Sequence, residues 1–256
     1  MEKKAATPDK ATQQENRQTL LSHLLALRNV LLVSAGALGV AFLVIFYTCV
    51  DWLMGLITGP IKARGIEIIY TAMSEALVTK LKVALIAAAI VASPIIIWQL
   101  WSFIKPALYD NEKKLFSGLF FVAVFLFLLG VTFCYVAVYF LAVDFFLVAG
   151  ENLATPMLGI DSYVGFLFGF IVPFGIAFLL PVALYITTRM GFTTADMLAK
   201  KRKFIILAIA VFAAVLTPPD IVSQCLLAIP MVLLYEVGIL VARFTKPRAR
   251  PEDMES

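Results

Sequence analysis

The chain has 256 residues, of which 62% are hydrophobic and 15% charged, and its formal net charge at pH 7 is +4. Soluble domains carry about 25% charged residues, so this composition excludes an ordinary soluble protein. The excess of basic residues does not indicate nucleic-acid binding, because these residues lie where membrane topology places them.

The first 28 residues form a polar segment that we expect to be a cytoplasmic N-terminal domain, residues 1–28. Its last part is predicted to be an amphipathic lead-in at the membrane interface, since His23 and Leu27 lie four residues apart on one helical face. The apolar run that follows is longer and begins later than the core of a cleavable signal peptide. It is therefore predicted to be an uncleaved first span.

Six apolar runs follow, and about 20 residues are needed to cross the hydrocarbon core as a helix. We predict an all-α polytopic membrane protein with a six-span domain over residues 29–244 and a disordered tail over 245–256. Prolines inside the spans predict kinks at Pro94, Pro173, Pro181 and Pro230. The predicted spans are 29–50, 83–101, 115–141, 163–187, 204–217 and 221–242.

The longest loop, residues 51–82, mixes apolar residues with glycine and proline, so we expect short interfacial helices there. The last two spans are short: a helix of the length of 204–217 reaches only about 21 Å. Gln224 and Glu236 interrupt the sixth span. The protein is therefore predicted to thin the bilayer here or to bury polar groups against a partner.

The turn between these two spans is Thr217-Pro218-Pro219-Asp220, and Asp220 is placed to cap the sixth helix. Topology follows from the distribution of Lys and Arg. With both termini in the cytoplasm, almost all basic residues lie inside, and those left outside are Lys62, Arg64, Lys80 and Lys82.

Few polar residues at membrane depth could carry function. Glu236 is either a snorkelling or internally hydrogen-bonded carboxylate, or a contact for a partner helix or a proton. Gln224 is either a helix–helix hydrogen bond or a substrate ligand. His23 is either structural or functional, and the first internal loop is either a solvated charge cluster or a binding surface.

Three cysteines, an odd number without paired spacing, argue against a disulfide framework or a metal site. The sequence has a single histidine and no nucleotide-binding, zinc-protease or hydrolase signature. We therefore expect no enzyme, no metal and no cofactor.

Several motifs, in order along residues 19–244, resemble the TatC family, the core subunits of the twin-arginine protein translocase. His23-Leu24 and Leu27-Arg28 resemble the family's His-Leu-x-Glu-Leu-Arg motif. The segment 101–112, with Trp101, Phe103, Pro106 and Glu112, resembles its first cytoplasmic loop. The segment 174–181 resembles its fourth span, and the block from Leu216 to Pro230, followed by Tyr235-Glu236, resembles its last hairpin.

The resemblance implies a cupped six-helix bundle in the bacterial inner membrane. It implies a receptor that binds twin-arginine signal peptides together with TatB, associates with further copies of itself, and recruits TatA to export folded proteins with the proton-motive force. The implied signal-peptide-binding residues are His23, Leu27, Arg28, Phe103, Pro106 and Glu112. The implied docking residues for TatA and TatB are Thr217 and Gln224, and the structural residues of the hairpin are Pro218, Pro219, Asp220 and Glu236.

Two positions depart from the family pattern: Ala26 replaces the glutamate of the first motif, and Leu179 replaces the Glu or Gln of the fourth span. A charge-assisted hydrogen bond is worth about 1.5–3 kcal/mol, so Ala26 predicts weaker signal binding. The alternative function is an ion-coupled small-solute transporter, which would require inverted repeats and a polar cavity at mid-membrane. Neither is visible in the sequence.

Overall fold

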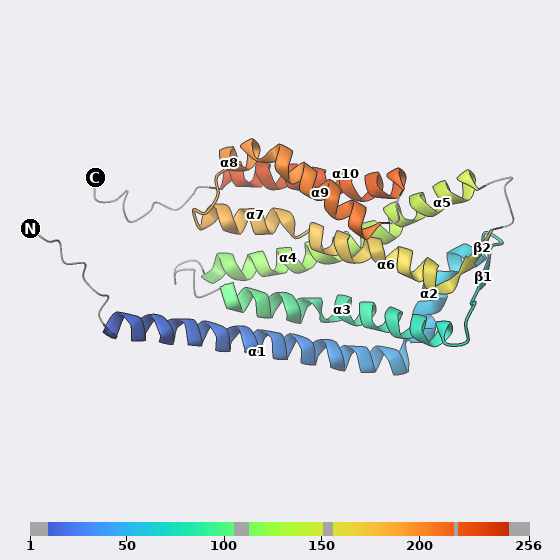
Figure 1. The fold of residues 1–256 in the computed structure, drawn as a ribbon, viewed down its shortest axis with the longest axis horizontal. Coiled ribbons are helices and arrows are strands. Elements are labelled where there is room, and N and C mark those ends of the chain that lie inside the picture. The colour runs from blue at the N-terminus through green and yellow to red at the C-terminus, as the bar shows by residue number, and fades with distance from the viewer. Residues whose placement is uncertain (1–9, 105–112, 151–155, 218–219, 246–256) are drawn as a thin grey trace, which may run out of the picture.

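The computed structural model describes residues 10–104, 113–150, 156–217 and 220–245, which form an elongated helical bundle with one small sheet (Figure 1). We call the end where α1 begins and α10 finishes the terminal end, and the opposite end, which holds the sheet, the strand end. In chain order the elements are α1 (Lys10–Thr48), α2 (Val50–Lys62), β1 (Glu67–Ile69), α3 (Glu75–Ile104), α4 (Lys113–Phe133), the π-helix η3 (Cys134–Tyr139), α5 (Phe140–Ala149), β2 (Met157–Gly159), α6 (Ile160–Ala177), α7 (Leu180–Arg189), α8 (Ala195–Lys200), α9 (Arg202–Leu216) and α10 (Ile221–Phe244).

Five helical stretches within the described residues are long and apolar enough to cross a membrane: 25–48, 75–102, 117–149, 160–189 and 221–244. They coincide with five of the predicted runs. The remaining run forms α9, which has 15 residues and reaches about 22 Å. A polytopic membrane protein is therefore confirmed, whereas a sixth span remains a prediction.

The predicted lead-in and first span form one continuous helix, α1, of 39 residues. Residues 1–9 and all but the first residue of the predicted tail lie outside the described part of the chain. α1 packs along α3 through small side chains, since Ala84 and Ala88 of α3 are completely buried beside Ile45. Small residues let two helices in lipid approach closely, and dispersion contacts then hold them together.

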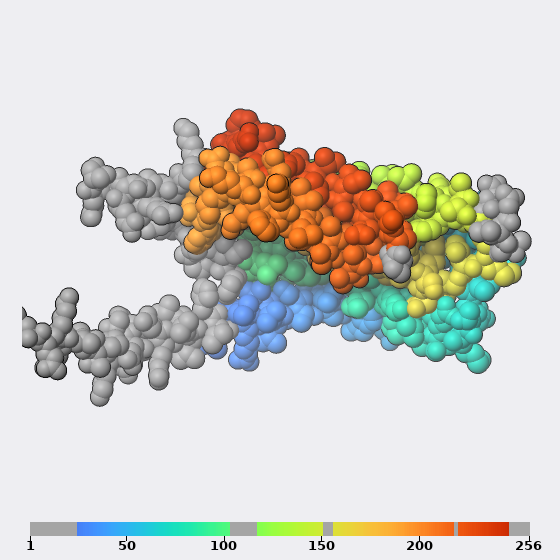
Figure 2. All heavy atoms as spheres, turned by 45° about the horizontal axis from the view of Figure 1, so that its top comes forward, coloured from blue at the N-terminus to red at the C-terminus, as the bar shows by residue number. Residues whose placement is uncertain are grey.

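The layers of the bundle are visible in the space-filling view (Figure 2). The spheres of α8, α9 and α10 form one side, those of α1 form the other, and α3 and α4 lie between them. A central core of Tyr139, Leu167, Phe170 and Phe174, all with no exposed surface, joins η3 to α6. Packing against the rest of the protein thus supports α6 along part of its length.

Two helix interruptions fall inside predicted spans. The run 115–141 contains the π-helix η3, which the hydrophobic pattern does not predict. The run 163–187 is broken after Ala177, and α7 starts at Leu180 with Pro181 in its first turn, as a proline-induced break requires. The helices containing Pro94, Pro173 and Pro230 continue through these residues.

The chain is mostly helical, as predicted, but the strand end also holds a small sheet that the sequence did not predict. The loop 51–82 forms the expected short helix, α2, but it also contains β1, which pairs in parallel with β2. Glu67 lies opposite Met157, and Ile69 lies opposite Gly159. Three-residue strands are too short to show a pattern in the sequence, and their pairing joins two loops that are far apart in the chain.

Candidate functional site

The residues implied in signal-peptide binding come from helices that meet at the terminal end. His23, Leu27 and Arg28 lie in the first half of α1, and Phe103 lies in the last turn of α3. Leu27 is 39% exposed and Arg28 is exposed. Pro106 and Glu112 lie outside the described residues, between the end of α3 and the start of α4. The fold therefore brings the flanking elements to one end of the bundle (Figure 1).

The positions that depart from the family pattern lie in different surroundings. Ala26 is exposed on α1 at the terminal end. Leu179 is half-buried, just before α7, and packs on a cluster that includes Ile97, Trp101 and Val182. The structure thus places an apolar side chain in an apolar setting at position 179, whereas Ala26 is exposed on α1 beside the exposed Leu25 and Leu27.

The hairpin of α9 and α10 is fixed by its own polar groups. The Thr217 hydroxyl, on a residue only 7% exposed, donates a hydrogen bond to the Ala213 carbonyl at 3.0 Å. The Asp220 carboxylate accepts one from the Ser223 backbone N–H at 2.6 Å, which confirms the predicted helix cap. Pro218 and Pro219 lie outside the described residues.

Gln224 joins the two helices of the hairpin. Its Nε2 donates a hydrogen bond to the Ala210 carbonyl on α9 at 3.0 Å. Of the two interpretations from the sequence, the helix–helix hydrogen bond is the one that the structure shows. No described residue donates to its Oε1, and the side chain is partly exposed. An acceptor therefore remains for another helix.

Glu236 forms a two-pronged ion pair with Arg202 at the start of α9. Arg202 Nε lies 2.7 Å from Oε1, and Nη2 lies 2.8 Å from Oε2. Of these two contacts only that of Nη2 is a hydrogen bond, because Nε lies close to the carboxylate but is buried without a hydrogen-bond partner. The neighbouring Tyr235 hydroxyl donates to the Leu198 carbonyl of α8 at 3.0 Å. Glu236 thus joins α10 to the start of α9, the internal one of its predicted roles, and Tyr235 joins α10 to α8.

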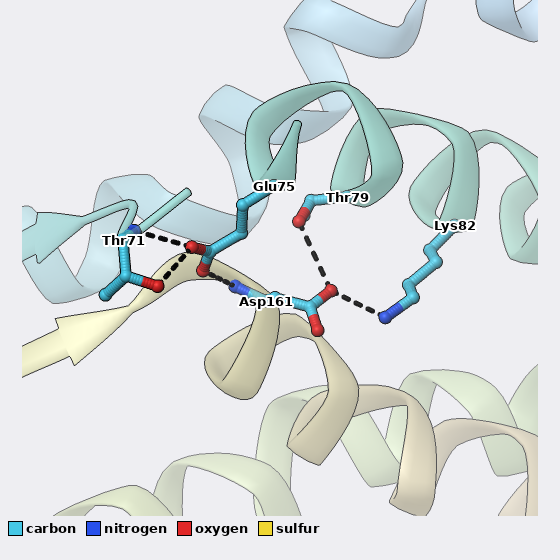
Figure 3. Close-up of polar contacts among 5 residues, drawn as sticks. All are labelled: Thr71, Glu75, Thr79, Lys82 and Asp161. Carbon is cyan, nitrogen blue, oxygen red and sulfur yellow. Dashed lines mark hydrogen bonds and ion pairs between the residues drawn. The ribbon is translucent and has the colours of Figure 1, made fainter. Parts of the chain in front are cut away.

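Sequence reasoning missed a polar cluster at the strand end (Figure 3). Glu75, in the first turn of α3, accepts hydrogen bonds from the Thr71 and Ala72 backbone N–H groups and from the Asp161 N–H at the start of α6. Asp161 in turn accepts from Lys82 at 2.6 Å and from the buried Thr79 hydroxyl at 3.4 Å. We call Thr71, Glu75, Thr79, Lys82 and Asp161 the strand-end cluster.

Two other cations of the strand end are also paired, whereas a third, Lys62, has no carboxylate partner among the described residues. Arg64 lies 2.9 Å from Asp144 and stands over the Phe140 ring at 5.4 Å, and Lys80 lies 2.5 Å from Asp51. The sequence contains little signal for these pairs, because each cation and its carboxylate lie 29 to 80 positions apart.

Comparisons with known proteins match this architecture. The model of the family described as Sec-independent protein translocase protein (TatC) matches residues 22–230. The TatC protein of Carboxydothermus hydrogenoformans is 38% identical, with 92% of this chain and 97% of that protein covered. That of Escherichia coli K12 is 34% identical, with 92% of each covered.

Solved structures of TatC proteins have the same fold as this chain. A crystal structure described as the twin arginine translocase receptor TatC superposes with a TM-score of 0.81 at 36% identity, over 87% of this chain and 99% of that one. A second crystal structure of that receptor, in the detergent DDM, gives 0.80 at 38% identity. These matches extend over nearly all of the described helices. The chain is therefore a member of the TatC family of protein translocase components, which are transport proteins of the membrane.

Proposed function

We propose that this chain is the receptor and core subunit of a twin-arginine translocase in the bacterial inner membrane. In this role it binds paired-arginine signal peptides with a TatB partner and recruits TatA for export of folded proteins, driven by the proton-motive force. The single observation that supports this most is the match in fold and sequence to twin-arginine translocase receptors over 87% of the chain.

The proposal includes six spans with the terminal end in the cytoplasm. The Lys and Arg distribution supports this orientation. α9 is too short for an average bilayer, but together with α10 it forms a hairpin that starts and finishes towards the terminal end (Figure 1). A short hairpin of this kind favours local thinning of the bilayer.

Orientation is tested by labelling single cysteines in intact cells with a membrane-impermeant maleimide, after replacing Cys49, Cys134 and Cys225 with serine. A cysteine at position 112 should react only after the cells are opened, and one at position 70 should react at once. Immediate labelling at position 112 would reverse the orientation and place the proposed receptor face outside.

Signal recognition is proposed to depend on Glu112. Paired guanidinium groups bind carboxylates through two parallel hydrogen bonds. Glu112 belongs to the loop between α3, which finishes at the terminal end, and α4, which begins there. His23, Leu27, Arg28, Phe103 and Pro106 are proposed to form the surrounding surface, with Leu27 and Arg28 already exposed.

The test is photocrosslinking of a twin-arginine signal peptide to the chain in membranes. Glu112→Gln keeps the size of the side chain but removes its charge, so the crosslinked product should fall to the level seen with a twin-lysine peptide. Asp196→Asn is the matched control, since Asp196 is an exposed carboxylate on α8 at the same end. Undiminished crosslinking in Glu112→Gln would remove this residue from the binding site.

Partner docking is proposed at Thr217 and Gln224. A polar contact between helices in lipid contributes about 0.6–2 kcal/mol, and Gln224 retains a free acceptor. Gln224→Leu should therefore reduce co-purification of a TatB partner several-fold. Cys225→Ala, at the next and exposed position, is the control. An equal yield of TatB with Gln224→Leu would reject this docking residue.

A further inference from the structure

A pocket of about 370 Å³ lies on the strand-end side of the short hairpin. Its walls come from α5, from β2 and the start of α6, and from Asp220 at the beginning of α10. α9 finishes and α10 begins short of the strand end (Figure 1). None of the signal-binding residues discussed above lines this pocket, and of the proposed hairpin residues only Asp220 does.

The polar end of the pocket carries an uncompensated negative charge. Oδ1 of Asp220 caps α10 through the Ser223 N–H, whereas Oδ2 is shielded from solvent and accepts no hydrogen bond from the described residues. No described Lys or Arg forms an ion pair with this carboxylate. Because Oδ2 is shielded, a cation in the adjacent pocket would not touch this oxygen. It would still stabilise the carboxylate, whose charge has no counterion among the described residues.

The remaining walls are aromatic and aliphatic. Phe146, Tyr163 and Phe166 line the pocket, and the rings of Phe146 and Phe166 meet edge to face with centroids 5.8 Å apart. The Tyr163 hydroxyl is engaged by the Ile57 carbonyl at 2.8 Å, so that residue offers its ring and not a donor. Aromatic rings beside a carboxylate are the chemistry that recognises organic ammonium ions.

The surroundings indicate that the ligand comes from the lipid phase. Large apolar side chains next to the pocket are exposed on both flanking helices: Phe145 and Val148 on α5 are 43% and 69% exposed, and Ile221 on α10 is 79% exposed. Side chains of this kind at the end of a membrane span contact acyl chains. These exposed apolar side chains would add nothing to the binding free energy of a water-soluble amine.

We propose that this pocket binds the headgroup of an ammonium-bearing phospholipid such as phosphatidylethanolamine. In the orientation proposed above the lipid belongs to the outer leaflet. The ammonium group lies between the aromatic rings and next to Asp220, and the hydroxyl of Ser162, which also lines the pocket, donates to a phosphate oxygen. The acyl chains run along the exposed faces of α5 and α10. Anionic lipids without an ammonium group are disfavoured by the Asp220 charge.

Native mass spectrometry of the full chain, purified and stripped of lipid, tests the proposal through binding alone. Phosphatidylethanolamine should bind about tenfold more tightly than phosphatidylglycerol with the same acyl chains, a difference of about 1.4 kcal/mol. Asp220→Asn should abolish this preference, since asparagine caps helices as well as aspartate does and only the charge is lost. Asp51→Asn, a strand-end carboxylate that does not line the pocket, should keep it.

Equal binding of the two lipids by the wild type would overturn the proposal, and so would an unchanged preference in Asp220→Asn. The occupant in cells is identified with a photoreactive amino acid in place of Leu147, in the pocket wall. A phospholipid adduct of the chain supports the proposal. An adduct with a polypeptide in place of lipid would show that the pocket is a protein-docking site and would refute it.

Discussion

The two ends of the bundle treat their charged groups differently. At the strand end, Arg64, Lys80 and Lys82 are each bound to a carboxylate from another element. At the terminal end, Lys200, Lys201, Lys203 and Arg243 have no such partner among the described residues, and Arg202 alone of the basic run 200–203 is paired.

We call the strand end a closed surface, because most of its cations are already bound to carboxylates. We call the terminal end an available surface, because the cations named there are not. Ion pairs between distant elements hold the strand end together and occupy most of its cations, with Lys62 as the exception among the described residues. The terminal end leaves its charges to solvent, to lipid headgroups or to a partner. These unpaired groups are cations, so they suit anionic lipid headgroups or the acidic groups of a partner. Binding of paired arginines is proposed to depend on the carboxylate of Glu112 instead.

The largest effect on stability is expected from breaking the strand-end cluster. Asp161→Ala removes the Lys82 ion pair and leaves the completely buried Thr79 hydroxyl without its acceptor. Hydrogen bonds to charged groups are worth about 1.5–3 kcal/mol, reduced here because both ion-pair partners are partly exposed, so we expect a loss of about 2 kcal/mol. Unfolding of the purified protein in detergent, followed by circular dichroism, measures it.

Two variants sharpen this measurement. Asp161→Asn still accepts both hydrogen bonds and should lose about half as much. Glu67→Ala, at an exposed strand-end position without a described partner, should change stability by less than about 0.5 kcal/mol. A loss as large in Glu67→Ala as in Asp161→Ala would show that the cluster has no special role.

Features that depend on residues close together in the sequence were predicted, whereas features that depend on contacts between distant residues were not. Apolar runs and the Asp220 cap depend on neighbours within a few residues, and both were predicted. The π-helix and the β1–β2 pair were missed, because the first depends on packing against α6 and the second on contacts between loops. Glu236 stayed ambiguous in the sequence, since its partner Arg202 lies 34 positions away.

The next effect concerns binding at the terminal end. Ala26→Glu introduces the acid that the family motif carries, at an exposed position on α1. One additional charge-assisted contact to a guanidinium should increase signal-peptide affinity about tenfold, or about 1.4 kcal/mol. Titration of a fluorescent twin-arginine peptide into reconstituted membranes measures it, and a twin-lysine peptide should gain less. If Ala26→Gln gained as much, the charge would not be the cause.

The smallest effect is expected from the ion pair between Arg202 and Glu236 at the terminal end. Arg202→Gln removes this pair, but both side chains are about two-fifths exposed, so water replaces much of the lost interaction and the cost should be only about 0.5–1 kcal/mol. The same unfolding measurement applies, and Lys203→Gln, with no carboxylate partner among the described residues, should cost less still. The loss of unfolding free energy in Arg202→Gln could instead equal or exceed that in Asp161→Ala. Ion pairing would then stabilise the terminal end as much as the strand end, and the contrast between a closed and an available surface would no longer hold.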